Sequence, residues 1–187
     1  MTTNQLTGIR PGTYLLDPAR SSCRITAAHV FGLRPVTGTM ALTGGTVTVA
    51  ADPERSIASA ELDASSFTTD DPRRDRDVRG RRFLDTVNHP EIGFRSTGLH
   101  LDPEGWRMTG VLAVRGGCCD VTLNVHPAIP VGDGYRLTAV CLVDRVAAGV
   151  TAGRPLIARH IRVELDLCAL RIPAVPTPHT ADAVSYP

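Results

Sequence analysis

Apolar and polar residues alternate along much of the chain between residues 13 and 170. In residues 36–42 every second residue is apolar or glycine, and the residues between them are Thr, Thr and Ala. The same period of two occurs in residues 106–114, 121–125 and 161–169. A helix would place apolar residues three and four apart, so this pattern predicts half-buried antiparallel strands.

Short segments rich in glycine separate the predicted strands. Gly44-Gly45 lies between two apolar runs, and glycine tolerates the positive φ values of a two-residue hairpin turn. Similar turns are expected at residues 102–105, 116–117 and 132–134. Such short connections join neighbouring strands into an up-and-down sheet. About eight strands need closure or a second sheet to hide their edges, so the residues predict an all-β barrel or sandwich.

One polar segment breaks the alternation and predicts a short helix. Asp71 can cap its start, Pro72 suits the first helical position, and Gly80 can end it. Six arginines and five aspartates between residues 70 and 85 leave a local charge of only +1. A solvated helix whose charges pair with one another is therefore favoured over an anion-binding site.

Composition and charge limit the classes of function. The chain has 187 residues, of which 42% are hydrophobic and 21% charged, as expected for one globular domain. A formal net charge of +1 argues against non-specific nucleic-acid binding. No apolar run approaches the roughly 18 residues of a membrane span, and no secretory signal is visible at the N-terminus. We therefore expect a cytoplasmic protein without an integral membrane segment.

Aromatic residues are scarce, because the chain has one Trp, three Tyr and four Phe. The interior must then be filled mainly by Val, Leu, Ile and Ala. A barrel of about eight strands can hold one small ligand in place of a solid core. The scarcity of aromatic residues is thus compatible with a cavity.

Five cysteines do not form the pattern of a disulfide framework, because their number is odd and no export signal is present. We interpret them as structural thiols, although the adjacent Cys118 and Cys119 leave a redox role open. Neither these cysteines nor the histidines have zinc-ligand spacing. We expect no metal and no cofactor.

The ends of the chain differ from its middle. Residues 1–12 are polar and aperiodic and are expected to be flexible, whereas residues 172–187 form a tail rich in proline. The β-domain is expected to span residues 13–171.

Several short motifs resemble those of the YceI-like family, the polyisoprenoid-binding, lipocalin-like proteins, and they occur in the order of that family. They are Tyr14-Leu-Leu-Asp-Pro at the start, His29, Val36-Thr-Gly38, Ser65-Ser-Phe-Thr-Thr69, Arg74-Asp75, Phe83-Leu-Asp85, His89-Pro90 with Phe94, residues 111–116, and Asp144-Arg145. The resemblance covers about residues 14–170.

This resemblance implies an extended, lipocalin-like antiparallel barrel of about eight strands with one short helix. It implies an apolar channel that holds a long isoprenoid or related amphiphile, and often a homodimer. No enzymatic activity is generally assigned to the family. The chain departs from the family at Asp77, at residues 116–120 and at residues 146–149, which are loops and strand ends.

His29 and Arg145 each end an apolar stripe on a predicted strand. The stripe that ends at His29 begins at Cys23, and the stripe that ends at Arg145 begins at Leu137. One interpretation is that both residues contact the head group of a ligand. The favoured alternative is that His29 bonds a backbone carbonyl and that Arg145 pairs with Asp75 or another buried acid.

Arg74 and Asp75 carry a family motif, and an anchor for the helix is favoured over a ligand contact. The longest aperiodic connection, residues 146–157, is expected to form a mobile flap at the cavity mouth. The remaining candidate ligand contacts are Arg154 in that connection and Ile25, Met40, Trp106, Leu123 and Cys141 on the predicted strands.

Three functions remain open on these observations. A binding protein for a hydrophobic, isoprenoid-like molecule is favoured, as a carrier, store or sequestering protein. The alternatives are an enzyme of the cyclase or isomerase type that uses the same cavity, and a stress-related interaction protein. No catalytic residue is nominated, because the chain shows no triad, phosphate-binding loop or pair of carboxylates on one cavity face.

Overall fold

The computed structural model describes residues 9–29, 35–153 and 157–173. The strands are β1 (Gly12–Leu16), β2 (Ser22–His29), β3 (Val36–Val49), β4 (Ile57–Thr68), β5 (Glu91–Asp102), β6 (Gly105–Val114), β7 (Gly117–Val125), β8 (Ile129–Val131), β9 (Gly134–Asp144) and β10 (Ile157–Arg171). One α-helix, α1 (Pro72–Arg79), and two 3-10 turns, Pro18–Arg20 and Pro53–Arg55, complete the described elements. Most of the two terminal segments expected to be flexible or rich in proline lies outside the described residues.

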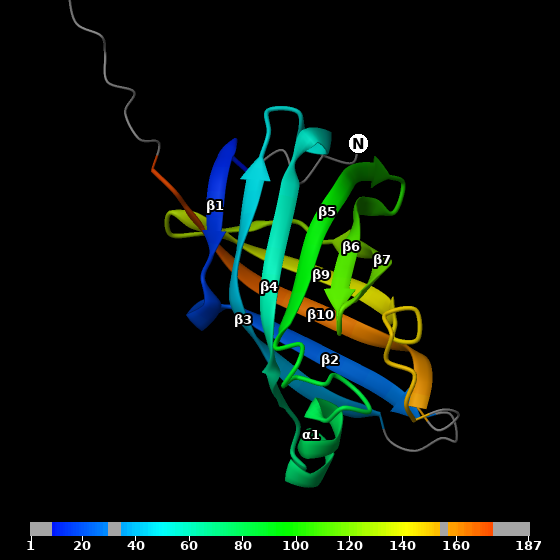
Figure 1. Ribbon diagram of the computed structural model, residues 1–187. Coiled ribbons are helices and arrows are strands. Elements are labelled where there is room, and N and C mark those ends of the chain that lie inside the picture. The colour runs from blue at the N-terminus through cyan, green and yellow to red at the C-terminus, as the bar shows by residue number, and fades with distance from the viewer. Residues whose placement is uncertain (1–8, 30–34, 154–156, 174–187) are drawn as a thin grey trace, which may run out of the picture.

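Eight strands form a closed antiparallel barrel in sequential order, as predicted (Figure 1). β2 to β7, β9 and β10 each pair with the next strand along the chain, and β10 returns to pair with β2. Two short strands are added to this barrel. β1 lies between β10 and β3 beyond the end of β2, and β8 pairs with the start of β9.

The alternation of apolar and polar residues sets which side chains face the barrel interior. In β7, Val121 and Leu123 are buried, whereas Thr122 and Asn124 between them are exposed. The inward residues form one large cluster and a smaller one around Tyr14. The predicted half-buried strands are therefore confirmed.

The hairpin turn predicted at Gly44-Gly45 is wrong, because both glycines lie inside the 14-residue strand β3. The register between β3 and β4 shifts just before Gly44, as in a β-bulge. Gly45 has a φ of +152°, and a Cβ there would lie 2.4 Å from the carbonyl oxygen of Ser59. Glycine within a strand marks a bulge or a close approach of backbone as well as a turn, and here it allows a long strand to bend.

The other predicted turns and the helix are present, although the turn predicted at residues 116–117 lies one residue earlier, at Arg115-Gly116. β5 and β6 turn at Pro103-Glu104, and β8 and β9 turn at Gly132-Asp133. The carboxylate of Asp71 accepts hydrogen bonds from the backbone N–H groups of Arg73 and Arg74, which caps α1 as expected. In the described residues, no helix combines the length and the hydropathy needed to cross a membrane.

Gly110 of β6 provides a test of how tightly the wall is packed. A Cβ at Gly110 would lie 2.4 Å from the Phe94 ring and 2.5 Å from the Arg95 carbonyl oxygen, whereas a Cβ at Gly93 would meet nothing within 4 Å. We expect Gly110→Ala to lower the free energy of unfolding by about 2 kcal/mol or more in urea titrations. Gly93→Ala, the matched control, should change it by less than about 0.5 kcal/mol. Equal effects of the two substitutions would contradict this packing.

Candidate functional site

A cavity of about 230 Å³ occupies the barrel interior at the end where α1 lies. All eight barrel strands contribute inward side chains to its wall, together with Val78 of α1 and with Phe83 and Leu84 of the following turn. Among the lining residues that the structure describes, only Arg74 and Arg145 are charged. Three of the four phenylalanines line this cavity, whereas Trp106, Tyr14 and Tyr135 do not.

A second cavity of about 100 Å³ lies toward the other end of the barrel, beside the turn Pro53–Arg55. The two cavities share five wall residues, which are Ala60, Phe94, Leu123, Leu165 and Leu167. These side chains narrow the interior between the two spaces. Sequence reasoning did not predict this division, because it depends on which inward side chains meet across the barrel.

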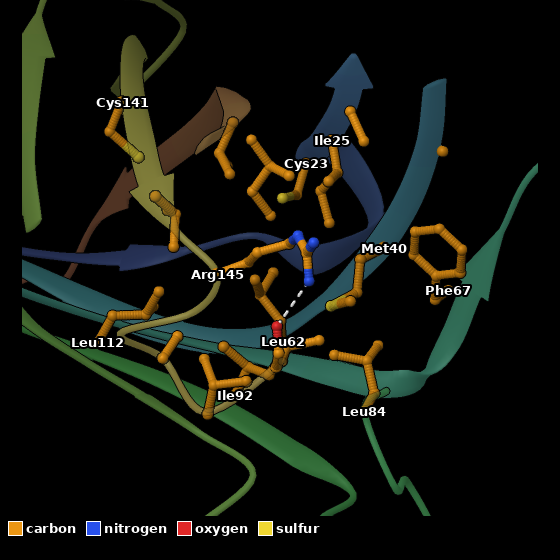
Figure 2. A pocket seen from close by; sticks show the side chains of 18 of the residues that line it. Cys23, Ile25, Met40, Leu62, Phe67, Leu84, Ile92, Leu112, Cys141 and Arg145 are labelled. Carbon is orange, nitrogen blue, oxygen red and sulfur yellow. Dashed lines mark hydrogen bonds between the residues drawn. The ribbon is translucent and has the colours of Figure 1, made fainter. Parts of the chain in front are cut away.

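Arg145 follows the last residue of β9 and is only 5% exposed. Its guanidinium donates hydrogen bonds to backbone carbonyl oxygens of the chain that connects β9 to β10 and of the first two residues of β10. The acceptors are Val150 at 2.7 Å, Ala152 at 2.6 Å, Ile157 at 2.9 Å and Ala158 at 2.8 Å. In Figure 2 the guanidinium reaches in among the cavity side chains, and the dashed line marks one of these bonds.

The predicted ion pair between Arg145 and Asp75 is not formed. Asp75 lies 3.8 Å from the Arg79 guanidinium, within α1 itself. Arg145 instead neutralises the partial charges of several carbonyls, which is a way to satisfy a buried guanidinium with five N–H donors. The sequence could not reveal this arrangement, since every residue has a backbone carbonyl and residue types do not show which carbonyls will accept from Arg145.

The connection after β9 borders the cavity, as predicted. Ala148 and Val150 are buried and line the cavity. The carboxylate of Asp144 accepts hydrogen bonds from the backbone N–H groups of Val146 and Ala147 and pairs with Arg159. The Arg159 contact is the main cause that lowers the pKa of Asp144 from 3.8 to about 2. Arg154, the nominated contact, lies outside the described residues.

Asp75 anchors α1 to the barrel, which is the interpretation favoured from the sequence. Its carboxylate accepts from the Thr69 hydroxyl at 2.7 Å, from the Thr69 backbone N–H at 2.9 Å and from the Thr68 hydroxyl at 3.0 Å. The Thr69 hydroxyl is the main cause that holds the pKa of Asp75 below its ordinary value. Asp75 is not among the residues that line either cavity.

Arg74 occupies a different position from its neighbour Asp75. It lines the large cavity, yet its side chain is 40% exposed. Its guanidinium lies 3.4 Å from the Thr69 hydroxyl and 3.6 Å from the Asp71 carboxylate. These are long contacts to partly exposed groups, so Arg74 is a cation at the rim between the apolar interior and the solvent.

Two thiols face the large cavity in a neutral form. Burial raises the pKa of the Cys23 thiol to about 12 and that of Cys141 to about 11, and each has a smaller contribution from another thiol. Both therefore line the cavity as apolar groups at neutral pH. All five cysteines are free, and Cys118 is the exposed member of the adjacent pair. Burial also raises the pKa of Cys119, which disfavours the reactive thiolate there.

Most of the nominated contacts come together in one place. Ile25, Met40, Leu123 and Cys141 line the large cavity with Arg74 and Arg145. Trp106 is buried but is not among the lining residues of either cavity. The backbone of His29 pairs with Ile157 at the end of β2, and its side chain lies outside the described part of the chain.

The closed barrel, the helix at its end and the apolar cavity in its interior together define a lipocalin-like β-barrel. The family model of the YceI-like domain matches residues 14–169. The chain therefore belongs to the YceI-like family. No curated protein sequence matches it.

Solved structures share this fold at low sequence identity. BcnA of Burkholderia cenocepacia superposes with a TM-score of 0.72 at 21% identity, covering 82% of this chain and 98% of BcnA. A polyisoprenoid binding domain from Saccharophagus degradans, implicated in plant cell wall breakdown, gives 0.63 at 14% identity, covering 87% and 100%. A YceI protein of Campylobacter jejuni gives 0.56 at 14% identity, covering 76% and 88%.

Removal of the Arg145 guanidinium should open the end of the barrel. We expect Arg145→Met to lower the free energy of unfolding by about 3 kcal/mol or more, because buried carbonyls lose their donors. Urea unfolding measures the change. Arg162→Met, which removes an exposed guanidinium paired with Glu164, should cost less than about 1 kcal/mol. A small effect at Arg145 would show that these hydrogen bonds do not hold the connection.

Asp144 should make the folded state sensitive to acid. Its pKa is about 2 in the folded protein, against an ordinary value of 3.8, so its contribution to stability is present above about pH 4. That contribution is lost as the pH falls from about 4 to about 2. We expect Asp144→Asn to be less stable at neutral pH and to lose less stability across this window. Denaturant midpoints measured against pH test this, with the exposed-turn variant Asp133→Asn as the control.

Proposed function

We propose that this protein binds a hydrophobic chain molecule with an anionic head group and acts as its carrier or store. The observation that carries the proposal is the apolar cavity of about 230 Å³, which has a cation at its rim. Lipid-binding pockets combine a large apolar wall with a small number of polar groups that fix orientation. The rim position of Arg74 supplies such a group.

The size of the cavity favours an occupant. By the relation between cavity volume and lost stability, about 24 cal/mol per Å³, an empty space of this volume costs on the order of 5 kcal/mol. Small domains have a total stability of only about 5–15 kcal/mol. A ligand that fills the space recovers dispersion contacts and removes its own apolar surface from water.

The shape of the interior favours a long chain. A molecule whose chain continues past the shared wall residues Phe94, Leu123 and Leu165 would reach the second cavity of about 100 Å³. Family membership and the polyisoprenoid binding domain of similar fold support an isoprenoid chain as the apolar part. Such a chain would be recognised by area and length, because its methyl branches offer no hydrogen bonds.

Arg74 supports an anionic head group over a neutral one. Phosphate and carboxylate groups bind guanidinium through short, charge-assisted hydrogen bonds. The long contacts of Arg74 to Thr69 and Asp71 are the ones that such a head group would replace. Arg145, in contrast, is already bonded to the connection after β9.

The proposal is tested by two probes that share a chain and differ in the head group, geranylgeranyl phosphate and geranylgeraniol. We expect the purified protein to bind both in fluorescence competition or calorimetry, and the phosphate more tightly. Arg74→Gln should weaken binding of the phosphate about tenfold and leave binding of the alcohol unchanged. Arg73→Gln, which removes an exposed arginine that is not part of the cavity lining, is the matched control.

A second variant tests the cavity itself. Val163→Phe adds a ring to the wall of the large cavity and should weaken binding of both probes. Mass spectrometry of gently extracted protein should in addition detect a co-purified lipid in the wild-type chain and less of it in this variant. If neither probe binds and no lipid is recovered, the proposed function is wrong.

A further inference from the structure

The turn that follows α1, residues 80–89, has two sides with different roles. On its inner side Phe83 and Leu84 line the large cavity. On its outer side Val87 is 90% exposed, the largest exposed fraction among the exposed large hydrophobic residues of the described chain. We call residues 80–89 the Val87 turn.

Val87 is exposed on a segment whose backbone is held by several hydrogen bonds. The backbone N–H groups of Phe83 and Asp85 both donate to the Gly80 carbonyl at 3.0 Å, and that of Thr86 donates to the Arg79 carbonyl at 3.0 Å. The Asn88 and His89 N–H groups then donate to the Asp85 carbonyl, at 3.0 and 2.9 Å. The valine is thus presented to solvent by fixed backbone.

Positive charge gathers on the same turn. The exposed charges in and just before the helix cancel, since Arg73 and Arg76 of α1 stand against Asp77 of α1 and Asp70 two residues before it. The Val87 turn itself carries the exposed residues Arg81 and Arg82. Arg115 joins them, because its guanidinium donates to the Arg81 carbonyl at 2.7 Å and to the Gly149 carbonyl at 3.3 Å. Against these three arginines the turn holds one acid, Asp85, whose carboxylate accepts from the Asn88 amide.

We propose that the Val87 turn docks on the surface of an anionic lipid bilayer, with Arg81, Arg82 and Arg115 on the lipid head groups and Val87 in the interface. An exposed apolar side chain on the same turn as several cations suits such a surface, which binds proteins through apolar contact and electrostatic attraction together.

Docking here would set the end of the cavity against the membrane. Phe83 and Leu84 separate the cavity from the outer side of the turn, and α1 lies at the same end of the barrel (Figure 1). A chain molecule could then pass between bilayer and cavity with little of its surface exposed to water. This second step rests on the proposed function, whereas the docking surface rests on the turn alone.

The test is co-sedimentation with vesicles of phosphatidylcholine mixed with phosphatidylglycerol, and with vesicles of phosphatidylcholine alone. We expect the full chain to sediment with the mixed vesicles, far less with the neutral ones, and less as salt is raised. Val87→Asp, and separately the double variant Arg81→Glu with Arg82→Glu, should each weaken binding to the mixed vesicles about tenfold or more. Val87→Ser should give a smaller loss.

Matched controls carry the same chemical changes elsewhere on the surface. Ile129→Asp changes an exposed aliphatic residue of β8, and Arg24→Glu with Arg162→Glu reverses two exposed charges on β2 and β10. Both controls should sediment like the wild type. Sedimentation that is absent, that is equal with neutral vesicles, or that falls equally in the controls would overturn the proposal. Because Val163→Phe should still bind vesicles, failure of ligand binding and failure of docking are told apart.

Discussion

The structure depends on the closure of one sheet by β10. This strand pairs with β9 over eleven residue pairs, and on its other side with β2 and then β1. Closure removes the sheet edges that would otherwise attract other chains, and it also sets the circumference of the barrel. The inward valines, leucines and isoleucines are too small to fill the interior of a barrel of that circumference. The same pairing that stabilises the fold therefore leaves an apolar cavity.

One end of this cavity is organised by two buried groups of opposite charge. Arg145 donates hydrogen bonds to carbonyls of the connection after β9. Asp75 accepts hydrogen bonds from hydroxyl and N–H groups that precede α1. Each charge is satisfied by polar groups of a nearby chain segment, so neither needs the other. Their neighbour Arg74 stays at the rim, where a cation can meet a ligand without a large desolvation cost.

The turn after α1 also has one side that faces the cavity and one side that faces the solvent. Leu84 faces the cavity and Val87 faces the solvent, although only two residues separate them. The positive φ of Asp85, +51°, reverses the chain between them. A residue that lines the apolar interior and an exposed apolar residue are therefore joined by a short piece of chain held by backbone hydrogen bonds.

Much of the fold was predictable from the sequence. Alternation with a period of two shows which residues of a strand face inward, whichever strands it pairs with. Ile25, Met40, Leu123 and Cys141 were predictable as cavity residues for this reason. The helix was predictable for a different local reason, because its segment breaks the alternation and begins with a capping aspartate and a proline. Gly44-Gly45 misled the prediction, since glycine permits both a turn and a bulge and only pairing with β4 decides between them. The sequence by itself thus determined the strands, their inward faces and the family. The tertiary structure decided the partners of Arg145, the division of the interior and the place of Trp106, because these follow from which residues distant in sequence meet when the barrel closes.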